Sequence, residues 1–545
     1  MISLCDRPQS VLEEAKSQGA LQPLKGICKE VAHSAHCPRM LPSRNDRWLR
    51  FALITIIVLS FAIRAHLASM PLERDEGEYG YIAQRMLQGI PPYAEAYTLK
   101  FPGTPVVYAV ILKLLGQTDT AIRWGLIVIN ALTMILIFYI GKILAQTKPE
   151  ENTGNNPWTT GLWAATVFAV MSLAPSMLGI TANAEHFALL PATAGSLLLL
   201  RSPSRTILLS SGICMGLAIC MKQPAITFAL MGMAWMVGSG AKTKRPGDIF
   251  ASLLLYAVGL VLPLFLMLVC LRNAGVYDTF HFWCFTYAQH YGGMWSFSDG
   301  LRHFARMFGH VLFDHALIFA VCAMGLAMTL RKNRRAFWIL SGLVIAGFVA
   351  TAPGLVFRPH YFLFIVPGIS LAAAFGLVSL GRWAPAGIIV LLWPWVMQQA
   401  VLRATPETAS RLLYPHNAFV ETRALGLALQ NETSPGEPIG ILGSEPQICF
   451  YAQRPMATPF VYMYPLMEPQ PFAAKMQQEL MQKLESSPPR ILIHVRIPTS
   501  WLAYRNSDMT LFNWMPRYLE PHYQRLQSIP CPENNEIVIY KLKAS

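Results

Sequence analysis

The chain has little charge for its length, and this shortage excludes an ordinary soluble protein. Only 14% of its 545 residues are charged and 53% are hydrophobic, whereas about 25% are charged in a typical soluble domain. Apolar runs recur along most of the sequence, as in proteins that cross a membrane several times. Acidic residues number 30 against 44 basic ones, but the basic residues fall mostly in short clusters between apolar runs. This distribution indicates membrane topology rather than a surface that binds nucleic acid.

The sequence also lacks two other signatures. Its ten cysteines include no Cys-x-x-Cys pair, so they give no sign of the redox and zinc motifs built on that spacing. The N-terminal segment has no apolar stretch that a cleavable signal peptide needs, and we expect residues 1–46 to be a disordered cytoplasmic extension. Two cysteines and two histidines in it match no zinc spacing: Cys28, His33, His36 and Cys37. Cys449 and Cys531 can form a disulfide if the C-terminal region is extracytoplasmic.

Apolar runs long enough to span a bilayer, or nearly so, predict about 11 membrane spans. They are residues 49–69, 121–145, 158–179, 183–200, 206–221, 223–239, 249–271, 307–330, 336–352, 361–380 and 384–401. With the N-terminus inside, the basic clusters at 201–205, 242–245 and 331–335 all face the cytoplasm, as the positive-inside rule requires. A shorter run at 104–116 would reverse this orientation if it were a span. We therefore expect a juxtamembrane or re-entrant helix there.

This topology brings the polar segments of the membrane domain, residues 47–401, to the outer side. They are the loop 70–120 that holds Asp75, the turn at Asn183-Ala-Glu185, the hairpin at Lys222, the aromatic loop 272–300 and the segment Arg358–Tyr361. The inner loops are short and basic. The sequence therefore predicts an active site at the outer face of the membrane that the chain spans, with loop 70–120 as its catalytic loop.

The region 402–545 has more charge and proline than the preceding part and no spanning run. Short apolar runs at 438–443 and 490–495 predict buried strands. Residues 473–484 predict an amphipathic helix, and 536–540 a late strand. The order strand, helix, strand predicts a small α/β domain, which the topology places outside the cytoplasm.

Four charges crowd into the segment Arg74-Asp75-Glu76-Gly77-Glu78, directly after the first apolar run. Acidic residues do not help membrane insertion and are costly inside hydrocarbon. Asp75 and Tyr79 have the spacing of one helix face, with Asp75 in the first turn, where the helix N-terminus favours a negative charge. An ionised aspartate can take a proton from an acceptor hydroxyl. The alternative is that Asp75 only caps the helix.

Other polar residues at the outer ends of the spans are candidates for substrate binding. Lys100 lies beside a Pro-Gly turn and can neutralise a phosphate, or it can extend to the lipid headgroups. Lys222 interrupts a long apolar stretch, which indicates either a functional charge or a tight turn between two spans. Further candidates, each weak alone, are Glu185, Arg358, His360 and Tyr361.

These residues resemble bacterial members of glycosyltransferase family 39, multi-span enzymes of the glycosyltransferase-C superfamily that are related to protein O-mannosyltransferases and to lipid A aminoarabinose transferases. The resemblance rests on Arg74–Tyr81, Gly89-x-Pro-Pro-Tyr93, Lys100-Phe-Pro-Gly103, Asn183-Ala-Glu185, Lys222-Gln-Pro224, Arg358-Pro-His-Tyr361, Gly443-Ser-Glu-Pro-Gln447 and Tyr451-Ala-Gln-Arg454. It covers most of residues 50–540.

The resemblance implies transfer of a sugar, with inversion, from a polyprenyl-phosphate donor to an acceptor outside the cytoplasmic membrane. Asp75 would deprotonate the acceptor hydroxyl, and Glu76 would orient the acceptor or help Asp75 to bind a divalent metal ion. Lys100 would lie near the donor phosphate. The aminoarabinose transferases carry an arginine where this chain has Glu78, so a second cation has to come from Arg358 or Lys222.

The identities of the sugar and of the acceptor (a protein, a glycolipid, a hopanoid or a cell-wall glycan) stay open. The competing hypothesis is a transporter or flippase of lipid-linked sugars. Transporters commonly place charges at the middle of the bilayer, in two repeated halves, whereas this sequence has no repeat and its charges lie at one face. We therefore expect a multi-pass enzyme of the inner membrane.

Overall fold

The structure is a computed structural model that describes residues 44–146, 156–201, 204–240, 245–383 and 386–544. It divides into the units Met1–Phe51 and Ala52–Ser545, and the features below lie in the second unit except for the start of helix α3 (Arg44–His66). The group Cys28, His33, His36 and Cys37 lies outside the described residues. The last three positions of the expected extension, 44–46, already belong to helix α3.

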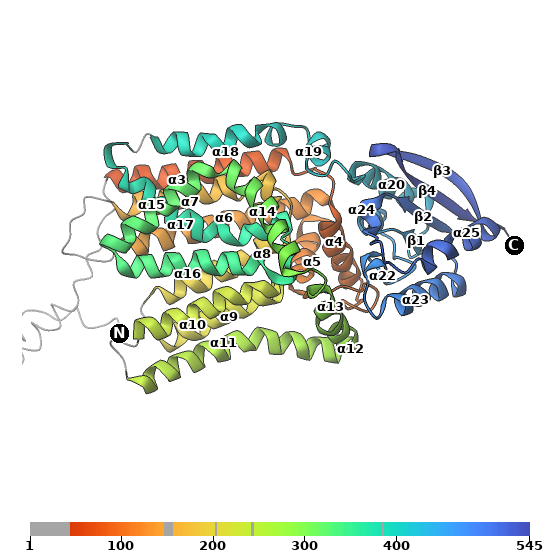
Figure 1. The fold of residues 1–545 in the computed structure, drawn as a ribbon, viewed down its shortest axis with the longest axis horizontal. Helices are drawn as coiled ribbons and strands as arrows, with labels where there is room; N and C mark the ends of the chain where they lie inside the picture. Colours follow the sequence, from red (N-terminus) through yellow and green to blue (C-terminus); the bar gives the residue numbers. More distant parts are fainter. Residues whose placement is uncertain (1–43, 147–155, 202–203, 241–244, 384–385, 545) are drawn as a thin grey trace, which may run out of the picture. The chain divides into compact units, whose positions relative to one another are not determined.

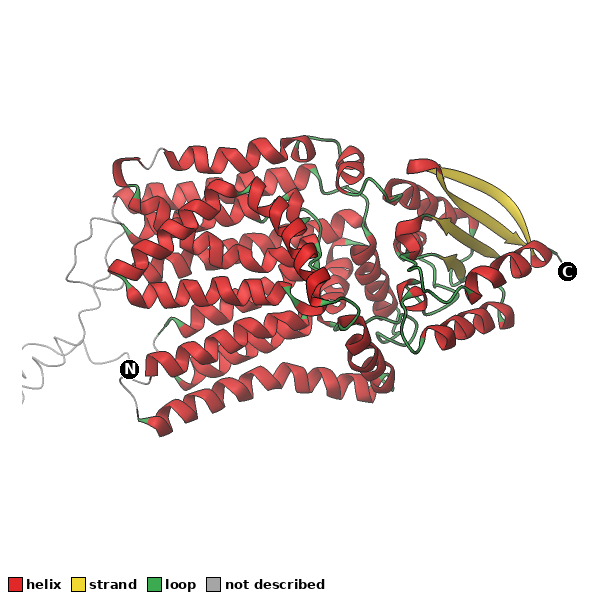
Figure 2. Cartoon of the chain, in the orientation of Figure 1, coloured by secondary structure: helices red, strands yellow, loops and turns green. Residues whose placement is uncertain are grey.

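Helices dominate the membrane part of the chain (Figures 1 and 2). Each predicted apolar run coincides at least in part with a described helix. The main helices besides α3 are α6 (Asp119–Ala145), α7 (Pro157–Met171), α8 (Ala184–Leu199), α9 (Arg205–Met221), α10 (Ile226–Gly240), α11 (Pro246–Asn273), α15 (Ala316–Lys332), α16 (Arg334–Thr351), α17 (Val366–Ser379) and α18 (Ala386–Leu402). Shorter ones are α12 (Tyr277–His281), the π-helix Phe282–Tyr287, α13 (Ala288–Gly292) and α19 (Pro406–Leu413).

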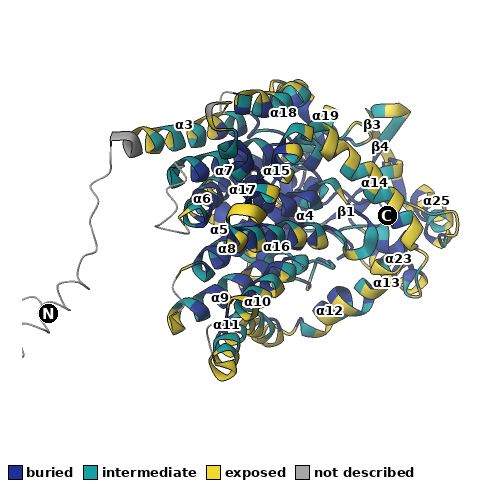
Figure 3. Ribbon diagram, turned by 60° about the vertical axis from the view of Figure 1, so that its left-hand side comes forward, coloured by how far each residue is buried: buried dark blue, intermediate teal, exposed yellow. Residues whose placement is uncertain are grey.

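Several helices are suited to crossing a membrane. Within the described ranges, five are long and apolar enough, or up to seven if each of two bent pairs is one span. α11 exposes apolar side chains such as Leu254, Val261 and Phe265, as expected for a helix that faces lipid, and Figure 3 shows intermediate and exposed positions along it. The protein is therefore a polytopic α-helical membrane protein. The predicted number of about 11 spans stays a prediction.

One predicted span coincides with a bent pair of helices. The run 307–330 is split between α14 (Phe297–Asp314) and α15, which meet at an angle of 89°. The corner contains His315, which is buried and whose ring lies 3.0 Å from the Val311 carbonyl oxygen and 3.0 Å from the Gln398 amide. The sequence of α14 alternates apolar and basic residues at helical spacing, so it is amphipathic and suits a surface rather than a spanning position.

The run 104–116 forms α5 (Gly103–Leu115). With 13 residues, it is shorter than the roughly 20 residues that cross a bilayer. It packs against α4 (Arg74–Leu87), which follows the first span. The prediction of a helix that does not span here agrees with this length.

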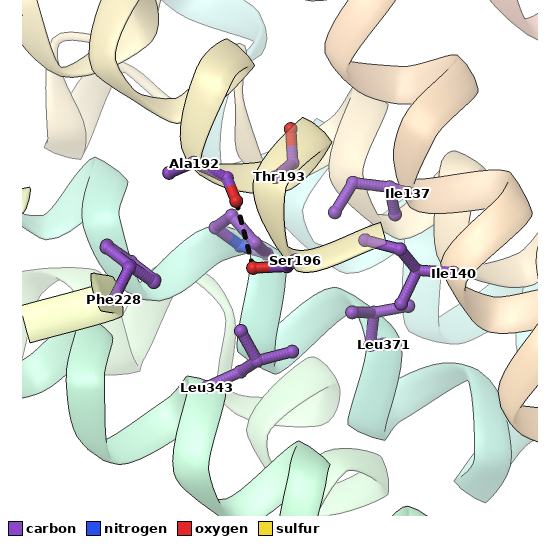
Figure 4. A pocket seen from close by; sticks show the side chains of 9 residues that line it. Ile137, Ile140, Ala192, Thr193, Ser196, Phe228, Leu343 and Leu371 are labelled. Atoms are coloured by element: carbon purple, nitrogen blue, oxygen red, sulfur yellow. Dashed lines mark hydrogen bonds between the residues drawn. The ribbon is translucent and has the colours of Figure 1, made fainter. Parts of the chain in front are cut away.

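The helices pack tightly at their centre. One internal void of about 10 Å³ lies between α6, α8, α10, α16 and α17 (Figure 4), which is about the space of one water molecule. Thr193 and Ser196 line it, but their hydroxyl groups donate to carbonyl oxygens of α8, such as those of Leu189 and Ala192. This void therefore offers no unpartnered hydroxyl to a ligand.

The C-terminal region contains the four strands of the described residues, in the order β1-β2-β4-β3. Strand β2 (Ile491–Arg496) pairs in parallel with β1 (Ile439–Leu442) and antiparallel with β4 (Asn535–Leu542), which pairs antiparallel with β3 (Tyr523–Cys531). The accompanying helices are α20 (Phe419–Glu432), α21 (Gln447–Ala452), α22 (Tyr464–Met467), α23 (Ala473–Ser486), α24 (Pro498–Trp501) and α25 (Thr510–His522). The region is thus α/β, as predicted.

The expected strands are confirmed as β1, β2 and β4, and the expected helix as α23. Strand β3 was not predicted, because most of its side chains are exposed and it presents no apolar run. Cys449 and Cys531 are both free thiols, so the structure does not contain the disulfide that the sequence left open.

The sheet and the helices α4 and α5 share one hydrophobic core. One apolar cluster contains Ile82 of α4, Leu112 of α5 and Ile493 of β2. At Gly77 the approach is so close that an added Cβ would lie 2.6 Å from the Cβ of Gln447. The C-terminal region therefore packs directly on the predicted catalytic loop. A domain boundary near residue 402 stays a prediction.

Candidate active site

Helix α4 begins with an acidic cap. Glu73 accepts hydrogen bonds from the backbone N–H groups of Asp75 (3.0 Å) and Glu76 (3.2 Å), and the Glu76 side chain accepts from the Glu73 N–H (3.2 Å). This is a capping box, which satisfies the free donors at a helix start. Since Glu73 performs this role, the side chain of Asp75 is not the cap.

The Asp75 carboxylate instead points into a cluster of polar side chains. Its Oδ1 atom lies 2.8 Å from Lys100 Nζ and accepts a hydrogen bond of 2.9 Å from the Tyr462 hydroxyl. Its Oδ2 atom lies 3.8 Å from Nε2 of His360. Burial would raise the pKa of Asp75, but Lys100, followed by His360 and Lys222, outweighs burial and holds the pKa well below its usual range. Asp75 is therefore ionised and one-fifth exposed, as a general base has to be.

Lys100 bridges two carboxylates. Besides Asp75, its Nζ atom lies 2.5 Å from Glu78 Oε2, and it lies 4.5 Å from the centre of the Tyr79 ring. Burial would lower the pKa of Lys100, but Asp75 and Glu78 raise it well above its ordinary value. The lysine therefore stays charged, and two acidic partners balance that charge.

The turn that carries Lys100 fits tightly against the membrane helices. An added Cβ at Gly103 would lie 2.4 Å from the carbonyl oxygen of Cys220, a distance that real Cβ atoms do not tolerate. The Lys100-Phe-Pro-Gly103 motif thus needs its glycine for close packing against the end of α9, directly before Lys222.

Lys222 and Glu185, predicted from separate spans, form an ion pair of 2.8 Å, and Lys222 also lies 4.7 Å from the centre of the Tyr361 ring. Tyr361 and His360 belong to the 3₁₀ segment Pro359–Ile365, just before α17. Together with the contact between His360 and Asp75, these pairs bring the predicted outer residues into one cluster.

Arg358 differs from the two lysines. Its side chain is exposed to solvent, and no acidic residue in the described ranges forms an ion pair with it. Partial desolvation by the surrounding protein would lower the pKa of Arg358, but Tyr291, Tyr361 and other neighbours, including Asp75, raise it. The site therefore contains one accessible cation whose charge no adjacent carboxylate neutralises.

Glu76 occupies a different environment from Asp75. Its carboxylate contacts Arg123 Nη2 at 2.6 Å and accepts from the Ala182 N–H at 2.5 Å as well as from the Glu73 N–H. Glu76 is fully buried, and no described partner is shared with the Asp75 carboxylate. The geometry favours an anchoring role and argues against the catalytic or acceptor-orienting role expected for Glu76.

A divalent metal ion does not fit this donor set. Asp75 is paired with Lys100, and Glu76 is paired with Arg123. Across the described ranges, no group of three or more His, Cys, Asp or Glu side chains lies close enough together to hold a metal ion. We therefore derive no step that needs a metal.

An apolar groove of about 640 Å³ lies beside the polar cluster. Its walls are residues of α4, α5, α9, α11 and the turn before α5: Met86, Gly89, Ile90, Pro91, Pro92, Pro102, Gly103, Val106, Ile213, Leu217, Cys220, Met221, Leu262, Pro263, Leu266, Met267, Cys270, Leu271 and Ala274. Pro102 follows Lys100 by two positions, and Met221 directly precedes Lys222. The groove thus runs past the backbone of both site lysines.

Comparison with known proteins finds no matching family model and no matching curated protein sequence. Solved structures do match. ArnT from Cupriavidus metallidurans in the apo state has a TM-score of 0.55 at 15% identity, covering 89% of this chain and 97% of that one. ArnT bound to undecaprenyl phosphate has a TM-score of 0.54 at the same identity and coverage. This chain therefore shares its overall fold with ArnT.

A weaker similarity, with a TM-score of 0.48, relates the chain to the apo oligosaccharyltransferase of Archaeoglobus fulgidus. The two are 12% identical over 81% of this chain and 69% of that one, and no conclusion is drawn from it. Membership of glycosyltransferase family 39 stays a prediction.

Within the fold shared with ArnT, the C-terminal region supplies site residues that sequence reasoning missed. Tyr462 contacts Asp75, and Arg74 pairs with Glu445 at 2.5 Å. Glu445 and Gln447, which packs against Gly77, belong to the Gly443–Gln447 motif on which part of the resemblance rests. That motif was the available signal for contact with α4, whereas nothing in the local sequence marks Tyr462.

Proposed function

We propose that this chain is an inverting glycosyltransferase. It moves a sugar from a polyprenyl-phosphate donor to an acceptor at the outer face of the cytoplasmic membrane. The observation that carries the proposal is the convergence, at one site, of an ionised Asp75, two partly buried lysines and the accessible cation Arg358, next to an apolar groove.

Asp75 would act as the general base. Its Oδ2 atom takes the proton of an acceptor hydroxyl while the acceptor oxygen attacks the anomeric carbon. The bond between that carbon and the phosphate oxygen breaks, and the bonding electrons leave with the phosphate. The products are the glycosylated acceptor, free polyprenyl phosphate and protonated Asp75, which then releases its proton to solvent.

The leaving phosphate needs positive charge more than it needs a proton, because its conjugate acid is already strong. Lys100 and Lys222 are balanced by Glu78, Asp75 and Glu185. Arg358 has no acidic partner in the described ranges, so we assign it to the donor phosphate. A guanidinium group also suits the geometry of a phosphate.

The apolar groove would hold the first isoprene units of the donor. Its volume of about 640 Å³ lies in the range of small-molecule sites, and its lining is almost wholly apolar. One ArnT structure of the same fold was solved bound to undecaprenyl phosphate. We carry that class of ligand over to this chain as part of the proposal.

To test the proposal, the purified protein is incorporated into vesicles that contain polyprenyl phosphate carrying a sugar, together with acceptor extracts from cell envelopes. A glycosyltransferase releases free polyprenyl phosphate and labels an acceptor, and both products depend on the acceptor extract. If the lipid-linked sugar instead changes leaflets without release of free polyprenyl phosphate, the chain is a transporter and the proposal fails.

A further inference from the structure

The loop 459–463 of the C-terminal region reaches the candidate base. Tyr462 is 387 positions from Asp75 in the sequence, yet its hydroxyl donates to Asp75 Oδ1 at 2.9 Å. The loop is tied at both sides of this tyrosine. The Pro459 carbonyl oxygen accepts from the Tyr97 N–H at 2.7 Å, and the Met463 N–H donates to Ser444 Oγ at 2.8 Å. The fold therefore holds the backbone on both sides of Tyr462 in place.

We propose that Tyr462 is a positioning residue for Asp75. With Lys100, it occupies Oδ1 and leaves Oδ2 as the oxygen that takes the acceptor proton. This inference rests on the proposed glycosyltransferase function and extends it, since it makes the C-terminal region a part of the active site.

The two carboxylate oxygens of Asp75 are not equivalent. Oδ1 has two donors, Lys100 at 2.8 Å and Tyr462 at 2.9 Å. The nearest cationic side chain to Oδ2 is His360 at 3.8 Å, which is beyond hydrogen-bond distance. Among the described residues, no donor is bonded to Oδ2. An acceptor hydroxyl that approaches the carboxylate therefore finds its free lone pairs on Oδ2.

Tyr462 can act only as a donor here. Burial raises the pKa of Tyr462 well above its ordinary value, and the nearby carboxylates of Asp75 and Glu78 raise it further. The phenol therefore keeps its proton at neutral pH. A hydrogen bond from a fixed neutral donor fixes the direction of the carboxylate without adding a charge to the site.

The matched control is Tyr464. Its ring stacks on that of Tyr462 at 5.2 Å between centres, but its hydroxyl donates to the Thr499 carbonyl oxygen at 3.0 Å rather than to Asp75. Tyr464→Phe thus removes a hydroxyl group two positions away, at the start of α22, and leaves the hydrogen bonds of Asp75 intact.

The test compares steady-state release of polyprenyl phosphate by wild type, Tyr462→Phe, Tyr464→Phe, Asp75→Asn and Tyr462→Phe with Asp75→Asn. We expect Tyr462→Phe to lower kcat about tenfold, the value of one lost hydrogen bond to a charged group. KM for donor and acceptor should stay within about twofold. Tyr464→Phe should match wild type. In the Asp75→Asn background, Tyr462→Phe should cause no further loss, because Tyr462 acts through Asp75.

Several results would overturn the inference. They are a wild-type kcat in Tyr462→Phe, an equal loss in Tyr464→Phe, a change confined to KM, or a tenfold loss that persists in the Asp75→Asn background. Gel filtration and thermal unfolding of each variant check that the fold is unchanged. No turnover in wild type removes the proposed function and this inference together. Turnover that is the same in Tyr462→Phe and wild type removes this inference alone.

Discussion

Nη2 of Arg123 lies 2.6 Å from Oε2 of Glu76, and the two side chains are 2% and 0% exposed. Adjacent residues on a helix diverge by about 100°, so Glu76 faces the membrane helices while Asp75 faces the polar cluster. The neighbouring carboxylates of one motif thus have different partners. This separation is the reason why we propose Asp75 as the base and Glu76 as an anchor.

Glu76→Gln should destabilise the protein, because it leaves the Arg123 charge buried without a carboxylate. Breaking a buried pair costs about 3–5 kcal/mol, so we expect a lower unfolding temperature in detergent and a lower yield of folded protein. The control is Asp299→Asn, which breaks the exposed pair of Asp299 with Arg302. A surface pair contributes about 0–1 kcal/mol. A fully stable Glu76→Gln protein without turnover would show that Glu76 is catalytic.

Lys100→Gln should make turnover sensitive to acid. In wild type the pKa of Asp75 is depressed, so its ionised form is present above that pKa and is lost only as pH falls through it, below the usual assay range. Without Lys100, His360 and Lys222 are left to oppose the effect of burial, so the pKa of Asp75 rises. We expect kcat to begin to fall at a higher pH in the variant than in wild type, because protonation of Asp75 removes the base. The measurement is a pH–rate profile, with the exposed Lys113→Gln as control. An unchanged profile in Lys100→Gln would contradict the electrostatic account of Asp75.

Arg358→Gln should weaken donor binding, because it removes the accessible cation assigned to the phosphate. The loss of a charge-assisted hydrogen bond corresponds to roughly a 10–100-fold rise in KM for the donor. KM for the acceptor should change little. The control is Arg517→Gln on α25, another exposed arginine. If KM for the donor is the same in Arg358→Gln and wild type, the phosphate lies elsewhere.

Leu217→Trp should narrow the apolar groove. Leu217 lines it and is 40% exposed. We expect KM to rise about tenfold for a donor with a long isoprenoid chain, a difference of about 1.4 kcal/mol. KM should stay within about twofold for a donor with two isoprene units. Leu230→Trp on α10 is the control, since Leu230 is 55% exposed but lies outside the groove lining. Equal effects on long and short donors would exclude the groove as the chain site.

Much of the candidate site could be predicted from the sequence, because the ends of spans follow from hydrophobic runs and basic loops. That argument placed Asp75, Lys100, Lys222 and His360 at one side, and the structure brings them together. The same argument could not predict which residues form ion pairs, such as Lys222 with Glu185. Those pairs depend on how spans that are distant in the sequence pack against one another.

Three features of the structure could not be predicted from local sequence patterns. The difference between Asp75 and Glu76 depends on Arg123, which lies on another helix. Tyr462 lies in an irregular loop, where no periodicity marks a side chain as functional. The corner at His315 interrupts a continuous apolar run, and composition alone does not distinguish a bent pair of helices from one span.

The most direct test of the account is the turnover of Asp75→Asn, an isosteric change that removes the base and leaves the fold and the hydrogen bond from Tyr462 possible. Release of free polyprenyl phosphate from sugar-charged polyprenyl phosphate is measured with wild type and variant at equal amounts of folded protein. We expect a loss of about 10²–10⁴-fold, the usual contribution of a general base. Wild-type turnover in Asp75→Asn would contradict the central claim and move the base to another residue.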